Sequence, residues 1–221
     1  MKVILLGPPG AGKGTQAQYI QNKYNIPQIS TGDILRSNIK NKTQIGLQVK
    51  KIINEGKLVP DNIIINMIIE RLRKEDCSRG FLLDGFPRTI EQANALQTVN
   101  INIDFVIEIK VPDQDIINRI TGRRIHEPSG RVYHISYNPP INEGLDDTTS
   151  EPLIQRKDDS IEIVKNRLNI YHKTTALLAD YYQKITLNGD EGHKTKYFKI
   201  NGSNSVKQVK QDIEKILTIR D

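Results

Sequence analysis

The chain has 221 residues, of which 37% are hydrophobic and 26% charged, which suits one α/β domain with insertions or two small domains. Its apolar runs are far too short to cross a bilayer, so we expect a soluble protein without membrane contacts. The net charge of +6 raises nucleic acid as a partner, but no long run of like charges occurs and only 5% of residues are aromatic. We therefore expect no nucleic-acid partner and favour a site that neutralises small-molecule phosphates.

The single cysteine, Cys77, excludes an intrachain disulfide and is typical of a reducing compartment. The apolar residues 3–6 are needed as a strand, so we expect no separable targeting segment before them. Both observations favour a cytoplasmic protein. No exposed apolar stripe is evident in the sequence, so a monomer is the expected state.

The first expected elements are a strand at residues 3–6, a glycine-rich turn and a helix, and the turn reads GPPGAGKGT at residues 7–15. Glycine lets successive backbone N–H groups point at phosphate oxygens, and the helix N-terminus adds partial positive charge. Lys13 can reach the outer phosphates. The usual hydroxyl residue after the lysine is replaced by Gly14, which moves the hydroxyl to Thr15. The expected nucleotide-binding residues here are Gly10, Ala11, Gly12, Lys13, Gly14 and Thr15.

The chain then alternates between short strands and helices. An extended piece at residues 27–30 leads into a helix, where Ser30 and Asp33 are spaced as a capping box. Residues 55–61 form a break, and Asp61 is expected to cap a helix with an apolar stripe along residues 64–72. A buried strand at residues 80–84 ends in Asp84, and a helix at 90–97, a strand at 105–109 and a helix at 112–120 follow.

This order of elements predicts a parallel sheet covered by helices, with ligands at the carboxyl ends of its strands. The glycine-rich loop and Asp84 both follow such strand ends. An acid in this place beside a P-loop commonly holds magnesium, often through water, so Asp84 is the expected Mg²⁺ residue.

The composition changes between residues 122 and 159, where aliphatic residues become rare and prolines, glycines and acids increase. This segment is too polar for a core and too long for a plain loop, so we expect a small lid with a hairpin strand at residues 131–135. A helix is expected from residue 160 to about 182, then a strand at 197–200 and an amphipathic helix at 206–217. Residues 187–194 are assigned no role.

Several motifs in this order resemble adenylate kinase. They read ISTGDILR at residues 29–36, EGKLV at 55–59, FLLDGFPR at 81–88 with Gln92, GRRIH at 122–126, SGRVYH at 129–134 and RKDD at 156–159. The resemblance covers nearly the whole chain, and the length of residues 122–159 is similar to the long-lid form of this nucleoside monophosphate kinase family.

The resemblance implies a P-loop NTPase-type parallel sheet flanked by helices, with an inserted helical AMP-binding domain and an inserted small β lid. The core would comprise residues 1–29, 60–121 and 160–221, the AMP-binding domain residues 30–59 and the lid residues 122–159. The implied reaction is reversible, Mg²⁺-dependent phosphoryl transfer from ATP to AMP, giving two ADP, which serves adenine nucleotide homeostasis.

The resemblance also implies a role for individual residues. The catalytic set would be Lys13, Arg88, Arg123, Arg156, Arg167, Asp158 and Asp159. ATP would contact the P-loop residues together with Arg119, Arg123, Val132, Tyr133 and Asn204. AMP would contact Thr31, Arg36, Lys57, Leu58, Val59, Gly85, Phe86, Arg88, Gln92, Arg156 and Arg167, with Gln92 reading the adenine edge. Because the acceptor is already an anion, the chemistry needs positioning and cations rather than a general base.

Some relatives hold structural zinc in the lid with two pairs of cysteines. This chain has His126, Ser129, Asp146 and Thr149 with the same paired spacing. Serine and threonine are poor zinc ligands, so we expect a hydrogen-bond network there and no structural zinc.

Three other functions are compatible with parts of the sequence. A related kinase with another base preference, GTP:AMP or UMP/CMP, is the main alternative, although Gln92 and Thr31 favour AMP. A nucleotide-binding regulator without turnover would not need so many convergent cations. A nucleic-acid-binding protein would need a basic run, and the sequence has none.

Overall fold

The computed structural model describes residues 1–188 and 195–219, so most of the stretch 187–194, to which the sequence assigns no role, lies outside it. Its centre is a five-stranded sheet with the order β2-β3-β1-β4-β7, in which every neighbouring pair is parallel. The strands are β1 (Lys2–Leu6), β2 (Gln28–Ser30), β3 (Phe81–Asp84), β4 (Phe105–Lys110) and β7 (Lys196–Asn201). The expected α/β fold with a parallel sheet is confirmed.

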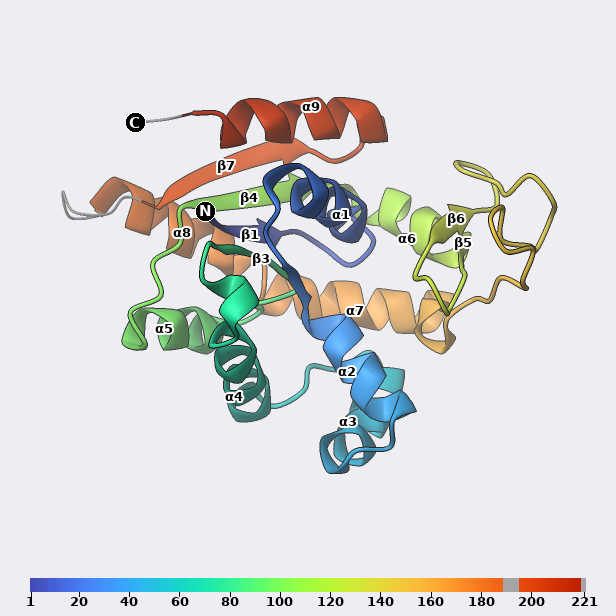
Figure 1. The fold of residues 1–221 in the computed structure, drawn as a ribbon, viewed down its shortest axis with the longest axis horizontal. Coiled ribbons are helices and arrows are strands. Elements are labelled where there is room, and N and C mark those ends of the chain that lie inside the picture. The colour runs from blue at the N-terminus through green and yellow to red at the C-terminus, as the bar shows by residue number, and fades with distance from the viewer. Residues whose placement is uncertain (189–194, 220–221) are drawn as a thin grey trace.

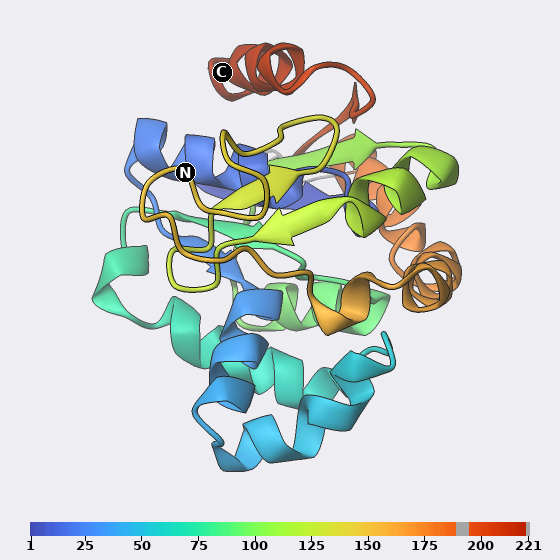
Figure 2. The same cartoon turned by 90° about the vertical axis from the view of Figure 1, so that its right-hand side faces the viewer.

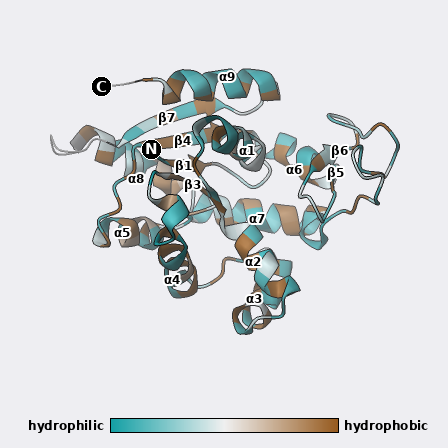
Figure 3. Ribbon diagram, viewed as in Figure 1, coloured by the Kyte–Doolittle hydropathy of each residue, from teal (hydrophilic) through white to brown (hydrophobic). Residues whose placement is uncertain are grey.

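Helices cover both faces of this sheet (Figure 1). They are α1 (Lys13–Tyr24), α4 (Asp61–Leu72), α5 (Ile90–Thr98), α6 (Asp113–Thr121), α7 (Ile161–Lys173), α8 (Leu177–Asn188) and α9 (Val206–Leu217). Alternate residues of β1 point to opposite faces, so Val3 packs in one core cluster with α1, α6 and α9, and Ile4 packs in another with α4, α5 and α8. Hydrophobic residues accordingly gather on the central strands and on α4 and α5 (Figure 3).

Two segments of the chain extend from this core. Helices α2 (Thr31–Lys40) and α3 (Gln44–Asn54) pack on each other between β2 and α4. Strands β5 (Arg123–Ile125) and β6 (Val132–His134) form a separate antiparallel pair, from which longer loops extend to the short 3-10 helix η2 (Lys157–Asp159). Figure 2 shows this pair in front of the core, with α2 and α3 below it.

Two local expectations are wrong. The helix expected from residue 160 to about 182 is two helices, because Thr174 leaves helical geometry and the chain turns before α8 begins. Asp61 is the first residue of α4 rather than its cap: Pro60 occupies the cap position, and no side chain caps the helix. The Asp61 carboxylate instead accepts hydrogen bonds from Thr89 and Gln92. The cap expected at Ser30 is present, since its hydroxyl oxygen accepts the Asp33 N–H at 3.3 Å.

Candidate active site

The glycine-rich loop joins β1 to α1 and is shaped by glycines in the left-handed region. Gly10 has φ of 78° and Gly12 has φ of 91°, a conformation that disfavours any side chain with a Cβ atom. Lys13 begins α1 and folds back over the loop, where its Nζ donates to the carbonyl oxygens of Gly7 at 2.8 Å and Pro8 at 2.7 Å. Burial lowers the pKa of Lys13 to about 8, against the opposing effect of the nearby Asp84 charge. The loop therefore holds a desolvated cation beside free helix N–H groups, which suits a bound phosphate.

Asp84 ends β3 directly beside the P-loop strand, since it pairs in register with Leu5 of β1. Burial raises the pKa of this carboxyl group, and the charge of Lys13 opposes that effect. Gln28, on the neighbouring strand β2, donates its amide N–H to Asp84 Oδ2 at 3.2 Å. Gln28 is not predicted from the sequence, because a single glutamine on a short strand carries no recognisable motif.

Arg88 follows the β3 end and is held against the turn at Gly85. Its Nε donates to the Gly85 carbonyl oxygen at 2.8 Å, and Thr31 at the start of α2 donates its hydroxyl to the same oxygen at 2.8 Å. Burial, with the neighbouring positive charge of Arg167, lowers the pKa of Arg88 to about 10. This guanidinium is therefore fixed in place with part of its donor set still available.

Two acids of η2 anchor two further arginines. Asp159 is fully buried and accepts both Nε and Nη2 of Arg123, at 3.0 and 2.5 Å. Asp158 accepts Nη1 of Arg167 at 2.9 Å. Both arginines are thus oriented by carboxylates before any ligand is present, and burial also lowers the pKa of Arg167.

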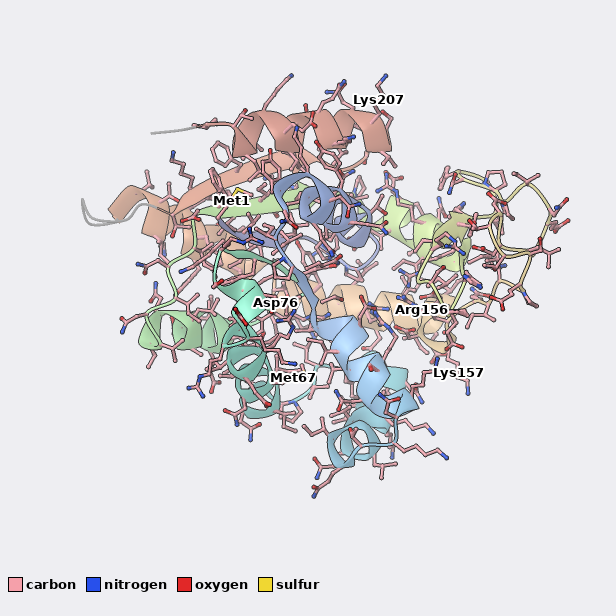
Figure 4. The ribbon with its side chains drawn as sticks, in the orientation of Figure 1. Met1, Met67, Asp76, Arg156, Lys157 and Lys207 are labelled. Atoms are coloured by element: carbon pink, nitrogen blue, oxygen red, sulfur yellow. The ribbon has the colours of Figure 1, made fainter. Side chains whose placement is uncertain are left out.

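Arg156 precedes η2 and is labelled in Figure 4. Its carbonyl oxygen accepts the Asp159 N–H at 3.1 Å, and its guanidinium forms no hydrogen bond or ion pair with the residues that the structure describes. Burial, together with the positive charges of Arg36 and Arg123, lowers its pKa to about 10. Arg36 itself is paired with Asp33 at 2.5 Å. Arg156 is therefore a cation without a fixed counter-ion, as expected for a group that awaits an anionic ligand.

These groups surround one cavity of about 1230 Å³, which is larger than the range typical of a site for one small molecule. The expected site residues that line it are Gly10, Ala11, Gly12, Lys13, Gly14, Thr15, Thr31, Arg36, Lys57, Leu58, Val59, Asp84, Gly85, Arg88, Gln92, Arg119, Arg123, Val132, Tyr133, Arg156, Asp158, Arg167 and Asn204. Phe86 and Asp159 are buried and lie outside the lining, where they support it.

At one end of the cavity Arg119 donates to the Gly202 carbonyl oxygen at 2.9 Å, which connects α6 to the loop after β7. Asn204 lies in the same loop and accepts a hydrogen bond from Asn201 at 3.4 Å. The Tyr133 hydroxyl donates to Asp146 inside the lid, so only part of this side chain is turned to the cavity. Val132 beside it is about half exposed.

The four paired lid residues lie together in one hydrogen-bond network. His126 Nδ1 lies 2.7 Å from the Ser129 hydroxyl, and Thr149 Oγ1 lies 3.0 Å from Asp146 Oδ2 and 3.2 Å from His126 Nε2. Arg131 also donates to both Asp146 oxygens, and this contact lowers the pKa of Asp146. A polar network whose members are mutually satisfied can hold a small lid without a packed core.

Glu151, which the sequence does not predict as part of this network, has its carboxylate 2.5 Å from His126 Nε2. Across residues 1–188 and 195–219, no group of three or more His, Cys, Asp or Glu side chains is placed to hold a metal ion. The same residues include no helix that is long and apolar enough to cross a membrane.

The cavity is suited to phosphoryl transfer between two polyanions. The P-loop and Lys13 offer one phosphate site at the strand ends, and Arg88 with its neighbours offers a second across the same cavity. Arginines fixed by carboxylates can stabilise charge on the transferred group without reorganising, and no general base is required. The fold and the site together define a P-loop phosphotransferase.

Comparison with known proteins identifies the family within this class. The family model described as adenylate kinase matches residues 5–187. A curated adenylate kinase of Photorhabdus laumondii subsp. laumondii is 55% identical over 217 residues, which is 98% of this chain and all of that protein. The chain belongs to the adenylate kinase family, and it is an enzyme.

Proposed function

We propose that the two phosphate sites of the cavity hold ATP and AMP, and that the enzyme transfers the ATP γ-phosphoryl group to AMP reversibly, giving two ADP. The observation that carries this proposal is the convergence of Lys13, Arg88, Arg123, Arg156 and Arg167 on one cavity. The family match supports the reaction, and neither comparison favours a GTP:AMP or UMP/CMP kinase.

In this proposal each part of the chain has its own role. The core would comprise residues 1–29, 60–121 and 160–221, with the AMP-binding domain at residues 30–59 and the lid at residues 122–159. The P-loop residues with Lys13 hold the ATP phosphates, and Arg119 lies where the ATP adenine would rest. The AMP phosphate is held by Arg88, while Thr31, Leu58 and Val59 border the AMP nucleoside.

Transfer itself depends on alignment and charge. Arg123, Arg156 and Arg167 surround the transferred phosphoryl group. Asp159 holds Arg123 in position, and Asp158 holds Arg167. With both nucleotides bound and the lid over them, water would be excluded, which would otherwise compete with AMP as acceptor.

Magnesium fits the donors that the cavity presents. Asp84 supplies a hard carboxylate oxygen beside the P-loop, and Mg²⁺ is commonly held by one or two carboxylates together with substrate phosphates and water. When bound, the ion would neutralise charge on the ATP phosphates. Gln28 fixes the orientation of the Asp84 carboxylate that would meet it.

The proposal includes a cytoplasmic monomer. The exposed large apolar side chains of the described residues are spread over α3, the end of α5, the lid, α7, α8, α9 and the residues after α9. Scattered single residues of this kind need no partner, whereas a contiguous apolar patch would.

A coupled assay over pairs of nucleoside triphosphates and monophosphates tests the proposed reaction. We expect turnover with ATP and AMP, and Lys13→Met and Arg88→Gly should each lower kcat by at least about 10²-fold, since each removes a cation from the transition state. Thermal unfolding is the control, because both variants should keep a Tm close to that of the parent protein. Near-normal kinetics in both variants would refute the assigned roles.

A further inference from the structure

Gln92 lines the cavity, yet both ends of its side-chain amide are already bonded to the protein. Its Oε1 accepts the backbone N–H of Arg88 at 2.8 Å, and its Nε2 donates to Asp61 Oδ1 at 2.6 Å. Only 2% of the residue is exposed. The orientation of the Gln92 side-chain amide is therefore fixed by the protein.

These two partners determine which way the amide points. A backbone N–H can only donate, so the atom facing Arg88 must be the amide oxygen. A carboxylate can only accept, so the atom facing Asp61 must be the amide nitrogen. A flipped Gln92 would place two donors against each other at Arg88 and two acceptors against each other at Asp61.

Asp61 and Arg88, the two partners of the Gln92 amide, are themselves held by neighbouring elements. Asp61 Oδ2 accepts the hydroxyl of Thr89 at 2.8 Å, and the same hydroxyl oxygen accepts the Gln92 backbone N–H at 3.2 Å. On the other side, the Thr175 hydroxyl donates to the Arg88 carbonyl oxygen at 2.9 Å. The start of α4, the start of α5 and the turn before α8 thus meet around one glutamine amide.

An amide oriented in this way keeps one free donor on Nε2 and one free acceptor on Oε1. Adenine offers the matching pair on one edge, an acceptor at N1 and an amino donor at N6. Hypoxanthine offers the reverse pair on that edge, a donor at N1 and an acceptor at O6, which only a flipped amide would match.

We propose that Asp61 is a specificity-determining residue for the acceptor nucleotide: by fixing the Gln92 amide, it sets the preference for a 6-amino purine monophosphate over a 6-oxo purine monophosphate. Asp61 acts through Gln92 and is thus a positioning residue. The inference rests on the proposed function, in which Gln92 reads the adenine edge of AMP.

The test compares AMP with inosine 5′-monophosphate as acceptors, with ATP as donor, in Asp61→Ala and Asp61→Asn. Both variants remove the same charge from the first turn of α4, so their effects on the helix are matched. Asparagine keeps a hydrogen-bond partner for Gln92, but its amide can donate as well as accept and so no longer requires Nε2 to face it; alanine offers no partner.

We expect Asp61→Ala to lower the AMP-to-IMP ratio of kcat/KM by about tenfold, the scale of losing one charge-assisted hydrogen bond. The KM for ATP should change little, and Asp61→Asn should also lower the ratio, because an amide does not select one orientation of the Gln92 amide. An unchanged ratio in Asp61→Ala would overturn the inference, and so would an unchanged ratio in Asp61→Asn.

A third variant separates this inference from the proposed function. Gln92→Ala should lose base discrimination if Gln92 reads the base at all, and thermal unfolding reports whether the variant is folded. Lost discrimination in Gln92→Ala with full discrimination in Asp61→Ala would overturn the role of Asp61 alone. Full discrimination in a folded Gln92→Ala would overturn the reading role of Gln92 and the role of Asp61 with it.

Discussion

The buried ammonium group of Lys13 makes ATP binding depend on pH in a predictable direction. Burial lowers the pKa of Lys13 to about 8 in the free protein, whereas a bound polyphosphate stabilises the charged form and raises it. Above pH 8, binding therefore takes up a proton, and affinity falls as pH rises. If the pKa in the complex lies well above 10, the dissociation constant for MgATP should increase about 20-fold between about pH 7.5 and about pH 9.5.

Isothermal titration calorimetry measures this dependence in two ways. The affinity for MgATP is determined at both pH values, and the proton uptake is measured from the change in apparent enthalpy between buffers of different ionisation enthalpy. Lys13→Arg is the matched control, because arginine stays charged throughout this range. An affinity that changes less than about threefold in the parent protein, with no proton uptake at the higher pH, would refute the reasoning.

Three further predictions concern the supporting contacts. Asp159→Asn leaves Arg123 without its carboxylate, so it should lower the free energy of unfolding of the free protein by about 3 kcal/mol, roughly 6–12 °C in Tm. Saturating MgATP should restore much of this loss, and equal losses with and without MgATP would contradict the expected phosphate contact. Asp146→Ala should increase amide hydrogen exchange in residues 126–151 by at least about tenfold while the sheet stays protected, and uniform deprotection would argue against a local lid network. Gln28→Leu should raise the Mg²⁺ concentration for half-maximal activity about tenfold and leave kcat at saturating Mg²⁺ unchanged. A lower Tm with an unchanged Mg²⁺ requirement would show that Gln28 has a structural role only.

The sequence predicts those parts of the site whose geometry is local. The P-loop is a strand, a turn and a helix in consecutive residues, and Asp84 is recognisable because an apolar strand stops at an acid. The order of strands and helices along the chain then suffices to predict that the P-loop and Asp84 lie close together, since parallel strands bring their carboxyl ends to one edge of the sheet.

The contacts that the sequence does not predict join distant segments. Gln28 lies 56 residues from Asp84, Asp61 lies 31 residues from Gln92, and Thr175 lies 87 residues from Arg88. The residue types involved are common at helix starts and turns, where capping is the ordinary explanation. The cap predicted at Asp61 is wrong for that reason: its position in the sequence fits a cap, and only the packing of α4 against α5 shows its carboxylate turned to Gln92.

The contacts within the site also explain how so many cations can be held together in a folded protein. Asp158 and Asp159 neutralise Arg167 and Arg123, which limits the electrostatic cost of holding these two arginines, and the Gly85 carbonyl orients Arg88 without neutralising it. Arg88 and Arg156 still bear the cost of burial near other positive charges, which is why the pKa of each is lowered to about 10. The electrostatic cost of burying these arginines is removed when phosphates bind, because the guanidinium groups then face anions. The site is therefore destabilised in the free protein in the way that favours binding two polyanions, and the directions of Arg88, Arg123 and Arg167 are set before they arrive.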